Sequence, residues 1–321
     1  MERCKASIDV NLPYNFHQRM ISVVIPTYNA APFLPLLLQK LNEQTILHEL
    51  IIIDSESTDC TQQLARKDSI VFISIPKASF NHGTSRNLGV QLAKNEIVVF
   101  LTQDALPATC YALENLVTML TSRKDIAMAY GRQLPYLKTG VFGRFARLIN
   151  YPETSVVKTK ELIPKMGIKT CSCSNSFAAY RKSELELIGG FPSDTILGED
   201  VSVAARFILQ GKGVAYCAEA EVYHSHDYTL SEEFKRYFDI GVFHKEQQEV
   251  LSEFSKAESE GFKYVIQEWN YLRQNDQIAL IPSQLLRTAA KYIGYKMGRF
   301  ENRIPKIIKL RLSMHPGFWV S

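Results

Sequence analysis

Acidic and imidazole side chains occur close to the ends of several apolar segments of this sequence. Asp54 and Asp104 come shortly after strand-length apolar runs, His224 ends a third run, and Glu199-Asp200 precede a segment of helical spacing. Carboxylates accept protons and bind hard cations such as Mg²⁺. Imidazole also accepts protons, and it binds softer metal ions. The residue types therefore predict a site for proton transfer and cation binding, provided that the fold brings these positions together.

The apolar runs in the first part of the chain have the length of strands, and segments of helical spacing separate them. Strands are predicted over 21–26, 50–54, 71–75 and 96–102, with helices over 31–44, 57–67 and 83–94 between them. This alternation predicts an α/β fold with right-handed crossovers and a mainly parallel, Rossmann-like central sheet flanked by helices. Ligands of such sheets bind outside the carboxyl ends of the strands, which is where Asp54 and Asp104 should lie.

The second part of the chain is less regular. Helices are predicted over 113–122, 182–188 and 199–210, and strands over 126–132, 175–180, 213–216 and 221–224. Glycines and prolines interrupt the pattern between 133 and 170, which predicts a mobile segment beside the site. Beyond Thr229 the chain reads as helical almost to its end.

Length and composition suggest three parts: a lead segment (1–20), a catalytic domain (21–235) and a helical, basic C-terminal extension (236–321). With 46% apolar and 22% charged residues among 321, the chain can bury a sizeable core. The first 20 residues lack a signal-type apolar stretch, and no later run reaches the roughly 18–20 apolar residues that span a bilayer. The six cysteines have no framework spacing. We therefore expect a reduced, cytoplasmic setting.

The positive charge is concentrated near the C-terminus. Residues 285–321 contain eight Lys or Arg and one Glu, a balance of +7, so the net charge of +4 leaves −3 for the rest. Apolar side chains alternate with these basic ones, a combination that suits the anionic inner surface of a membrane. The alternative is a helical pair that packs on the catalytic domain with a solvated basic face. Nucleic acid is not expected as a partner, because no recognition motif accompanies the charge.

Five motifs in a fixed order resemble a known family: VVIPTYNA (23–30), IIIDSESTD (51–59), FNHGTSRNLG (80–89), FLTQDALP (100–107) and ILGEDVSVAAR (196–206). Together they are similar to the inverting glycosyltransferases of family 2, which have the GT-A fold. The versions DSESTD, FNHGTSRN and LTQDA resemble those of bacterial rhamnosyltransferases. The resemblance implies transfer of L-rhamnose from dTDP-β-L-rhamnose to a hydroxyl of a growing surface polysaccharide, O-antigen or lipid-linked glycan, with inversion.

The resemblance also assigns a nucleotide-binding crevice. It implies the following nucleotide-binding residues: Pro26, Thr27, Tyr28, Asp54, Arg86 and Gln103. Asp54 would accept the N3–H of thymine, and Arg86 would lie near the base and diphosphate. The alternatives are a helix-capping role for Asp54, which Asp59 fills more plausibly, and a solvated surface position for Arg86.

The segment Thr102-Gln103-Asp104 takes the place of the family's metal-binding DxD motif. Only Asp104 is acidic here, but Mg²⁺ keeps several waters and needs few protein ligands. Some members of the fold use a histidine at about the place of His224, so the resemblance implies Mg²⁺ or Mn²⁺ on Asp104 and His224, with His226 as the second candidate histidine. The alternative for both histidines is a structural role.

Glu199-Asp200 supply the carboxylate that inverting transfer needs to remove the proton of the acceptor hydroxyl. The resemblance makes Asp200 this base and gives Glu199 a positioning role. The alternative is a favourable interaction of both acids with a helix N-terminus. Ser174, Asn175 and Ser176 could hydrogen-bond a sugar or phosphate nearby.

Three other functions fit parts of the pattern. The nearest is the same fold with a UDP-hexose donor, for a galactosyl-, glucosyl- or N-acetylglucosaminyltransferase. A nucleotidyltransferase would have a glycine-rich, basic loop after the first strand, and residues 23–33 lack one. A non-catalytic protein that binds a nucleotide sugar is the most distant alternative.

Overall fold

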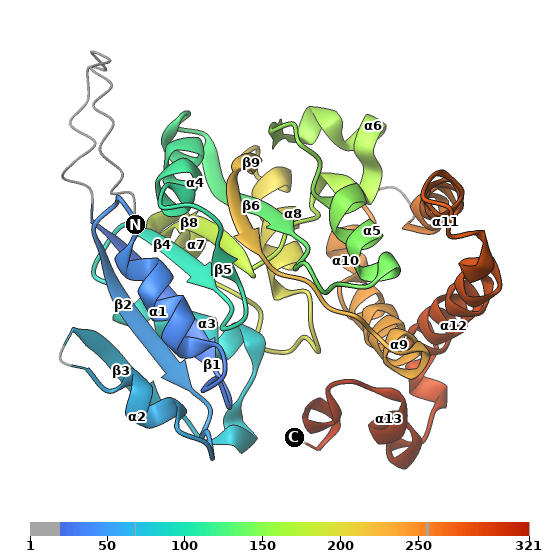
Figure 1. The fold of residues 1–321 in the computed structure, drawn as a ribbon, viewed down its shortest axis with the longest axis horizontal. Coiled ribbons are helices and arrows are strands. Elements are labelled where there is room, and N and C mark those ends of the chain that lie inside the picture. The colour runs from blue at the N-terminus through green and yellow to red at the C-terminus, as the bar shows by residue number, and fades with distance from the viewer. Residues whose placement is uncertain (1–19, 68, 255–256, 321) are drawn as a thin grey trace.

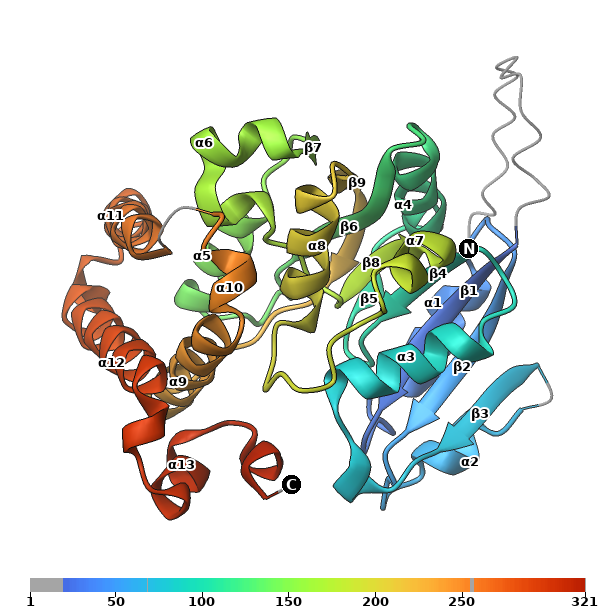
Figure 2. The same cartoon turned by 180° about the vertical axis from the view of Figure 1, so that it is seen from behind.

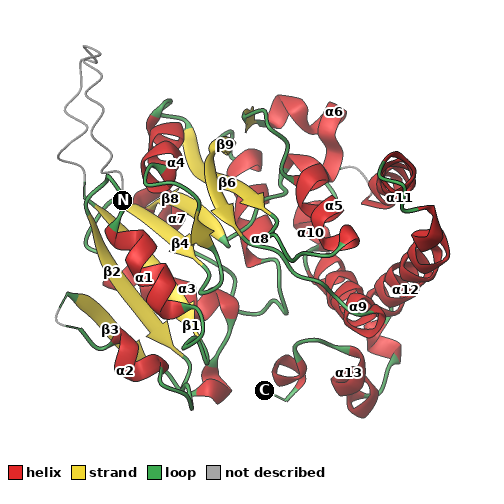
Figure 3. Cartoon of the chain, in the orientation of Figure 1, coloured by secondary structure: helices red, strands yellow, loops and turns green. Residues whose placement is uncertain are grey.

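The computed structural model describes residues 20–67, 69–254 and 257–320. All of the predicted lead segment except Met20 therefore lies outside the described residues. The described chain forms a sheet with helices packed on both faces, followed by a C-terminal stretch that contains only helices (Figures 1 and 3).

The first four long strands form the parallel half of the sheet. They are β1 (Ile21–Thr27), β2 (His48–Asp54), β3 (Ile70–Ser74) and β4 (Ile97–Leu101). Their spatial order is β3-β2-β1-β4, all parallel. The chain moves outward from β1 to β3 and then returns to the other side of β1. The carboxyl ends of β1 and β4 thus lie at a topological switch point, where ligands bind in open α/β sheets.

The second half of the sheet mixes strand directions. Its strands are β5 (Leu106–Pro107), β6 (Ile126–Leu134), β7 (Val156–Lys158), β8 (Phe177–Arg181) and β9 (Gly213–Tyr223). The strand β8 lies antiparallel between β4 and β6, and β6 pairs in parallel with β9. Residues 213–223 form one long strand, so the prediction of two strands there was wrong.

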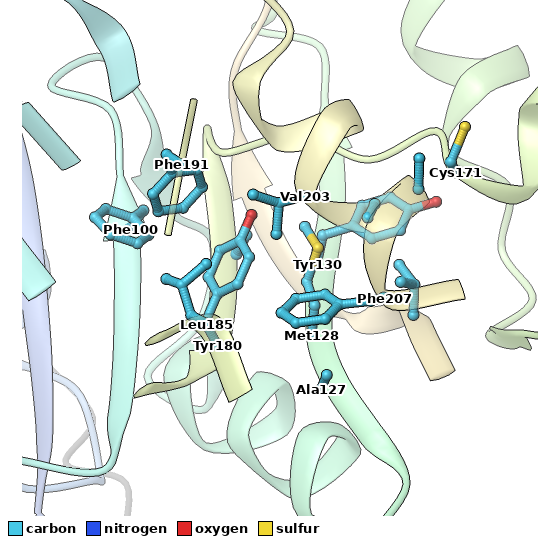
Figure 4. Packing of buried hydrophobic residues seen from close by; sticks show 14 of the residues in the cluster. Phe100, Ala127, Met128, Tyr130, Cys171, Tyr180, Leu185, Phe191, Val203 and Phe207 are labelled. Carbon is cyan, nitrogen blue, oxygen red and sulfur yellow. The ribbon is translucent and has the colours of Figure 1, made fainter. Parts of the chain in front are cut away.

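Alternate side chains of the central strands enter two different cores. Val24, Ile51 and Phe100 face one core, whereas Val23 and Ile52 face the other. Because both faces are covered, the strands read as continuous apolar runs. In the first core, Phe100 contacts Tyr180 and Phe191 edge to face, with ring centroids 5.6 and 5.3 Å apart (Figure 4).

Helices from different parts of the chain cover the two faces. The helices α1 (Leu34–Asn42) and α4 (Ala112–Thr121) cover one face. The opposite face carries α3 (His82–Leu92), α7 (Lys182–Leu187) and α8 (Glu199–Leu209), which are in front in Figure 2. The short α2 (Thr61–Ala65) precedes β3.

Residues 133–170 contain more regular structure than the glycine and proline pattern predicted. They include α5 (Val141–Asn150), strand β7 and α6 (Ile163–Met166). The helix α5 buries Phe145, whose ring lies 5.1 Å from that of Tyr264 in the C-terminal helices. Packing against these helices, which are distant in sequence, stabilises a segment whose local pattern suggested a loop.

The C-terminal extension consists of helices. They are α9 (Leu230–Glu246), α10 (Gln248–Leu251), α11 (Ala257–Gln274), α12 (Ile281–Arg299) and α13 (Lys306–Leu312). The predicted boundary at residues 235/236 falls inside α9. None of the helices in the described part of the chain combines the length and apolar character needed to cross a bilayer.

Glycines bring α9 and α12 into close contact. A Cβ atom on Gly241 would lie 2.2 Å from the carbonyl oxygen of Tyr295, and one on Gly298 would lie 2.0 Å from that of Phe238. These distances are shorter than any van der Waals contact, so the two backbones approach this closely only because the side chains are absent. The extension is therefore packed firmly onto the helix that leaves the catalytic domain.

Candidate active site

The loops that follow β1 and β4 are joined at the switch point. The backbone N–H of Tyr28 donates to Oε1 of Gln103 at 2.8 Å, and Nε2 of Gln103 donates to the carbonyl of Tyr28 at 3.1 Å. Tyr28 is 37% exposed, and its hydroxyl accepts a hydrogen bond from Lys77 at 2.5 Å. The amide of Gln103 thus positions the loop that carries Tyr28, and both residues lie where a ligand of this sheet is expected.

Asp54 lies at the end of β2 and is fully buried. Its carboxylate accepts hydrogen bonds from the hydroxyl of Thr27 at 2.9 Å and from the backbone N–H and hydroxyl of Ser57 at 2.9 and 2.5 Å. Pro26 pairs with Ile53 one step earlier in the strands. Asp54 therefore organises the turn after β2 but does not cap α2, whose N-cap residue is Cys60, and a direct contact with a base stays a prediction. Asp59 accepts from the N–H of Thr61, the first residue of α2.

Asp104, His224 and His226 form a cluster whose nearest ligand atoms all lie within 4.8 Å of one another. An Oδ2 of Asp104 is 3.4 Å from Nε2 of His224 and 3.7 Å from Nε2 of His226, and the two imidazole nitrogens are 3.1 Å apart. Two ligands each about 2.1 Å from one ion are about 3.0–3.4 Å apart at coordination angles between 90° and 110°. The cluster therefore fits a single divalent cation, with His226 as well as His224 within reach.

A second layer of contacts orients His224. Its Nδ1 is 2.9 Å from Oε1 of Gln133, and the same oxygen accepts a hydrogen bond from Arg147. Since this oxygen only accepts, Nδ1 of His224 carries the proton and Nε2 presents its lone pair toward Asp104. The imidazole is thus held in the tautomer that can bind a metal.

The charges of the cluster also suit a cation. Burial raises the pKa of Asp104, but the contact with His224 outweighs this effect and holds the pKa well below its usual range. Burial and the neighbouring His224 lower the pKa of His226 to about 4. At neutral pH the cluster therefore offers a carboxylate and an uncharged imidazole from His226, as a metal site requires.

The carboxylate pair Glu199-Asp200 begins α8. Gly198 precedes it with φ of +76°, a left-handed conformation that few other residues adopt, and the ring of Phe243 would lie 2.8 Å from a Cβ atom there. One Oδ of Asp200 accepts from the backbone N–H of Asn175 at 2.9 Å. The side chain of Asn175 donates to Glu199 at 3.1 Å and accepts from the hydroxyl of Tyr180 at 2.6 Å. Asn175 therefore fixes both carboxylates.

Arg86 extends from α3 to the same pair. Its Nη1 lies 3.0 Å from Oε1 of Glu199, and only 6% of each side chain is exposed. The alternative of a solvated surface arginine is therefore wrong. The contact of Arg86 with the nucleotide stays a prediction.

The two adjacent carboxylates have opposite pKa shifts. Burial and the charge of Glu199 raise the pKa of Asp200 to about 6. Burial also opposes ionisation of Glu199, but the Arg86 guanidinium, His82 and the hydrogen bond from Asn175 together outweigh it and hold the pKa of Glu199 below its ordinary value. The pKa of Asp200 is thus raised toward neutral pH, which is what a general base needs.

The segment 174–176 connects the two halves of the site. The hydroxyl of Ser174 accepts a hydrogen bond from Gln133, Asn175 holds Asp200, and the carbonyl of Ser176 accepts from the N–H of Thr102. The sequence suggested that these small polar residues might contact a ligand, but their role in joining the metal cluster to the carboxylates was missed. No local signal identifies Gln133 or Arg147, because their role depends on β6 and α5 lying beside His224.

This chain resembles known glycosyltransferases along most of its length. The profile of "Glycosyl transferase family 2" matches residues 22–189. The O-antigen chain rhamnosyltransferase RfbN of Salmonella typhimurium is 45% identical over 302 residues, which are 93% of this chain and 96% of the relative. WbaN of Salmonella anatum, another O-antigen chain rhamnosyltransferase, is 41% identical over 93% of this chain and 95% of its own length.

Solved structures share the fold. A mannosyltransferase of Pyrobaculum calidifontis, PcManGT in complex with GDP-Man and Mn²⁺, superimposes with a TM-score of 0.56 at 18% identity, over 91% of this chain and 84% of that one. TarS of S. aureus (residues 1–349) gives a TM-score of 0.52 at 17% identity over 88% and 91%. The GT-A fold expected from the motifs is thus confirmed. On its sequence and its architecture, this chain belongs to glycosyl transferase family 2.

Proposed function

We propose that this protein is an inverting rhamnosyltransferase that transfers L-rhamnose from dTDP-β-L-rhamnose to a hydroxyl of a growing O-antigen or lipid-linked glycan. The observation that carries this proposal is the 45% identity to an O-antigen chain rhamnosyltransferase over nearly the full length of both chains. Because the similarity to this relative covers the C-terminal helices as well as the sheet, it supports the same donor and the same class of acceptor for both proteins.

In the proposed reaction Asp200 removes the proton from the acceptor hydroxyl. The oxygen then attacks the anomeric carbon on the face opposite the dTDP leaving group, so the C–O bond to the diphosphate breaks as the new glycosidic bond forms. One step of this kind inverts the configuration and needs no covalent intermediate. Glu199 and Asn175 keep Asp200 in place, and the raised pKa of Asp200, about 6, lets it accept the proton and release it afterwards.

Asp104, His224 and His226 are the residues that would hold a divalent cation. Such an ion neutralises charge that develops on a departing diphosphate. Two imidazoles with one carboxylate suit Mn²⁺ better than Mg²⁺, which prefers oxygen ligands. Gln133 and Arg147 orient the cluster from behind.

We further propose that the protein works at the cytoplasmic face of a membrane. Exposed apolar and basic side chains alternate on α13 and the end of α12, on a surface formed by Ile293, Phe300, Arg303, Lys306, Ile307, Ile308 and Arg311. The other basic residues of the extension mostly turn inward: Arg287 and Lys291 pair with Glu233, and Lys309 pairs with Glu301. The extension thus packs inward through some cations, and the basic side chains that stay exposed support the proposed membrane contact.

Donor selectivity tests the function. The purified protein is mixed with dTDP-β-L-rhamnose, UDP-glucose, UDP-galactose or UDP-N-acetylglucosamine, each with Mn²⁺, and slow donor hydrolysis is followed by proton NMR. We expect hydrolysis of the dTDP sugar only, with α-L-rhamnose as the first anomer released. Preference for a UDP sugar would assign a different donor, and β-L-rhamnose as the first product would contradict inversion.

A further inference from the structure

A large pocket lies between α5 and the C-terminal helices, away from the switch point of the sheet. Its volume is about 1060 Å³, and its walls come from α5, α9, α11 and α12. We call it the helical pocket. Pockets for drug-sized molecules have volumes of about 300–1,000 Å³, so this one has room for more than a single sugar ring.

The helical pocket borders the active site described above. His226, a member of the metal cluster, lines it, and so does Arg147, which hydrogen-bonds Gln133 behind His224. Ser172 lines the pocket three residues before Asn175, the residue that holds Asp200. A molecule bound in the pocket would therefore have one end beside the reacting groups.

Buried polar atoms without partners gather around this pocket. Within the described residues, ten buried side-chain nitrogen or oxygen atoms have no hydrogen-bond partner, and four of them belong to residues of its wall: Arg147 Nε, Glu233 Oε2, Glu268 Oε1 and Arg287 Nε. Glu233 and Glu268 are only 7% and 2% exposed. A buried polar atom without a partner costs free energy, so four such atoms in the residues that line one cavity favour a polar ligand that supplies the missing partners.

Aromatic side chains form part of the remaining wall. Tyr237, Tyr264 and Phe142 line the pocket, and Lys291 lies over the rings of Tyr237 and Tyr264 at 5.9 and 5.5 Å. The guanidinium of Arg287 lies 4.7 Å from the ring of Phe142. These contacts fix flat apolar surfaces next to the unpartnered carboxylate and guanidinium atoms.

We propose that the helical pocket binds the sugar chain of the acceptor. The carboxylate oxygens accept hydrogen bonds only and the guanidinium nitrogens donate only, whereas a sugar hydroxyl does both. The apolar faces of sugar rings match the aromatic wall. A hydrocarbon chain would leave all four polar atoms without partners. A phosphate would suit the basic residues of the wall but would offer no donor to the unpartnered carboxylate oxygens of Glu233 and Glu268. This assignment rests on the proposed function and adds the location and chemistry of its acceptor site.

The test uses two variants of the full chain, each with a matched control. Glu268→Gln removes the anionic acceptor in the pocket, and Glu249→Gln makes the same change at an exposed position of α10. Ala289→Trp places a ring in the pocket from an exposed position of α12, and Leu286→Trp places one on α12 outside the pocket wall. Saturation-transfer NMR with the methyl glycosides of L-rhamnose, D-mannose and D-galactose and with their disaccharides measures binding, with inorganic pyrophosphate as competitor. Thermal stabilisation by dTDP with Mn²⁺ is measured in parallel.

We expect saccharide signals from the wild type and both controls and at least a fivefold loss in Glu268→Gln and Ala289→Trp, with stabilisation by dTDP unchanged. Equal saccharide binding in all five proteins, no binding by the wild type, or displacement by pyrophosphate would overturn the assignment. If saccharides bind in the pocket but dTDP-rhamnose is not used, the pocket assignment stands and the proposed donor fails.

Discussion

Arg86 and Glu199 form a buried ion pair, with Nη1 and Oε1 3.0 Å apart. The pair joins α3, which precedes β4, to α8, which carries the proposed base. We therefore expect Arg86 to act on catalysis through Glu199, by fixing the carboxylate next to Asp200 and by favouring its ionised form.

Replacing Glu199 by glutamine should move the pH profile of the enzyme. The charge of Glu199 raises the pKa of Asp200, so its removal should let Asp200 ionise at lower pH. For the wild type we expect kcat/KM to fall as the pH drops below about 6, and in Glu199→Gln this fall should occur at lower pH. The variant should also unfold more easily by about 3–5 kcal/mol, because Arg86 remains buried without its partner. Glu186→Gln, at an exposed glutamate, is the control. An acidic limb that does not move would show that Glu199 does not tune Asp200.

Replacing Asp200 by asparagine should stop transfer while donor binding persists. The amide keeps the size of the side chain but cannot accept the acceptor proton, so kcat should fall about 10²–10⁴-fold. Stabilisation by dTDP and Mn²⁺ in thermal unfolding should stay near that of the wild type. Near-normal turnover by this variant would rule out Asp200 as the base.

Metal binding should depend on a residue that does not touch the metal. Gln133→Met keeps the volume but removes the acceptor that orients His224, and the affinity for Mn²⁺ should fall roughly 10–100-fold. Gln39→Met, on the exposed face of α1, serves as control. Electron paramagnetic resonance of free Mn²⁺ in the presence of dTDP measures the affinity, and EDTA should abolish transfer by the wild type. Full activity in EDTA would argue against a metal-dependent reaction.

A methyl group at the contact between α9 and α12 should destabilise the protein. The added Cβ of Gly298→Ala would lie 2.0 Å from a carbonyl oxygen, so the helices must move apart, at a cost of about 1–3 kcal/mol. At Gly317 a Cβ would meet no atom within 4 Å, which makes Gly317→Ala the matched control. Denaturant unfolding distinguishes the two variants. Equal stability would mean that the close contact is not maintained in solution.

Membrane binding should depend on the exposed apolar residues of α12 and α13. The double variant Ile293→Ser, Ile307→Ser removes two side chains that are 51% and 68% exposed, and binding to vesicles with 30% phosphatidylglycerol, as a test composition, should weaken about tenfold or more. Leu47→Ser changes a residue of similar exposure, 64%, in the loop before β2 and is the control. If both proteins sediment equally with vesicles, this surface is not the membrane contact.

The sequence was sufficient to predict the parallel strands and the positions of their polar ends. Buried strands such as β1 and β2 are apolar throughout, and residues placed at strand ends or helix starts, such as Asp104 and Asp200, therefore lie at a predictable edge. The antiparallel insertion of β8 and the helix α5 could not be predicted, because both depend on contacts between distant segments. The same limit applies to Gln133, which acts on His224 only because two strands pair side by side.

Thr102 stands where the first acidic residue of the DxD motif would be, and Gln103, at the middle position, holds the Tyr28 loop through two hydrogen bonds. The cluster formed by Asp104, His224 and His226 therefore carries a single carboxylate charge when both imidazoles are neutral. A divalent cation there would keep one net positive charge, which two or three carboxylates would have cancelled. Such a site holds a diphosphate product more strongly than an acidic one does. We therefore expect the spent nucleotide to leave slowly, and the nucleoside diphosphate product should inhibit the enzyme strongly.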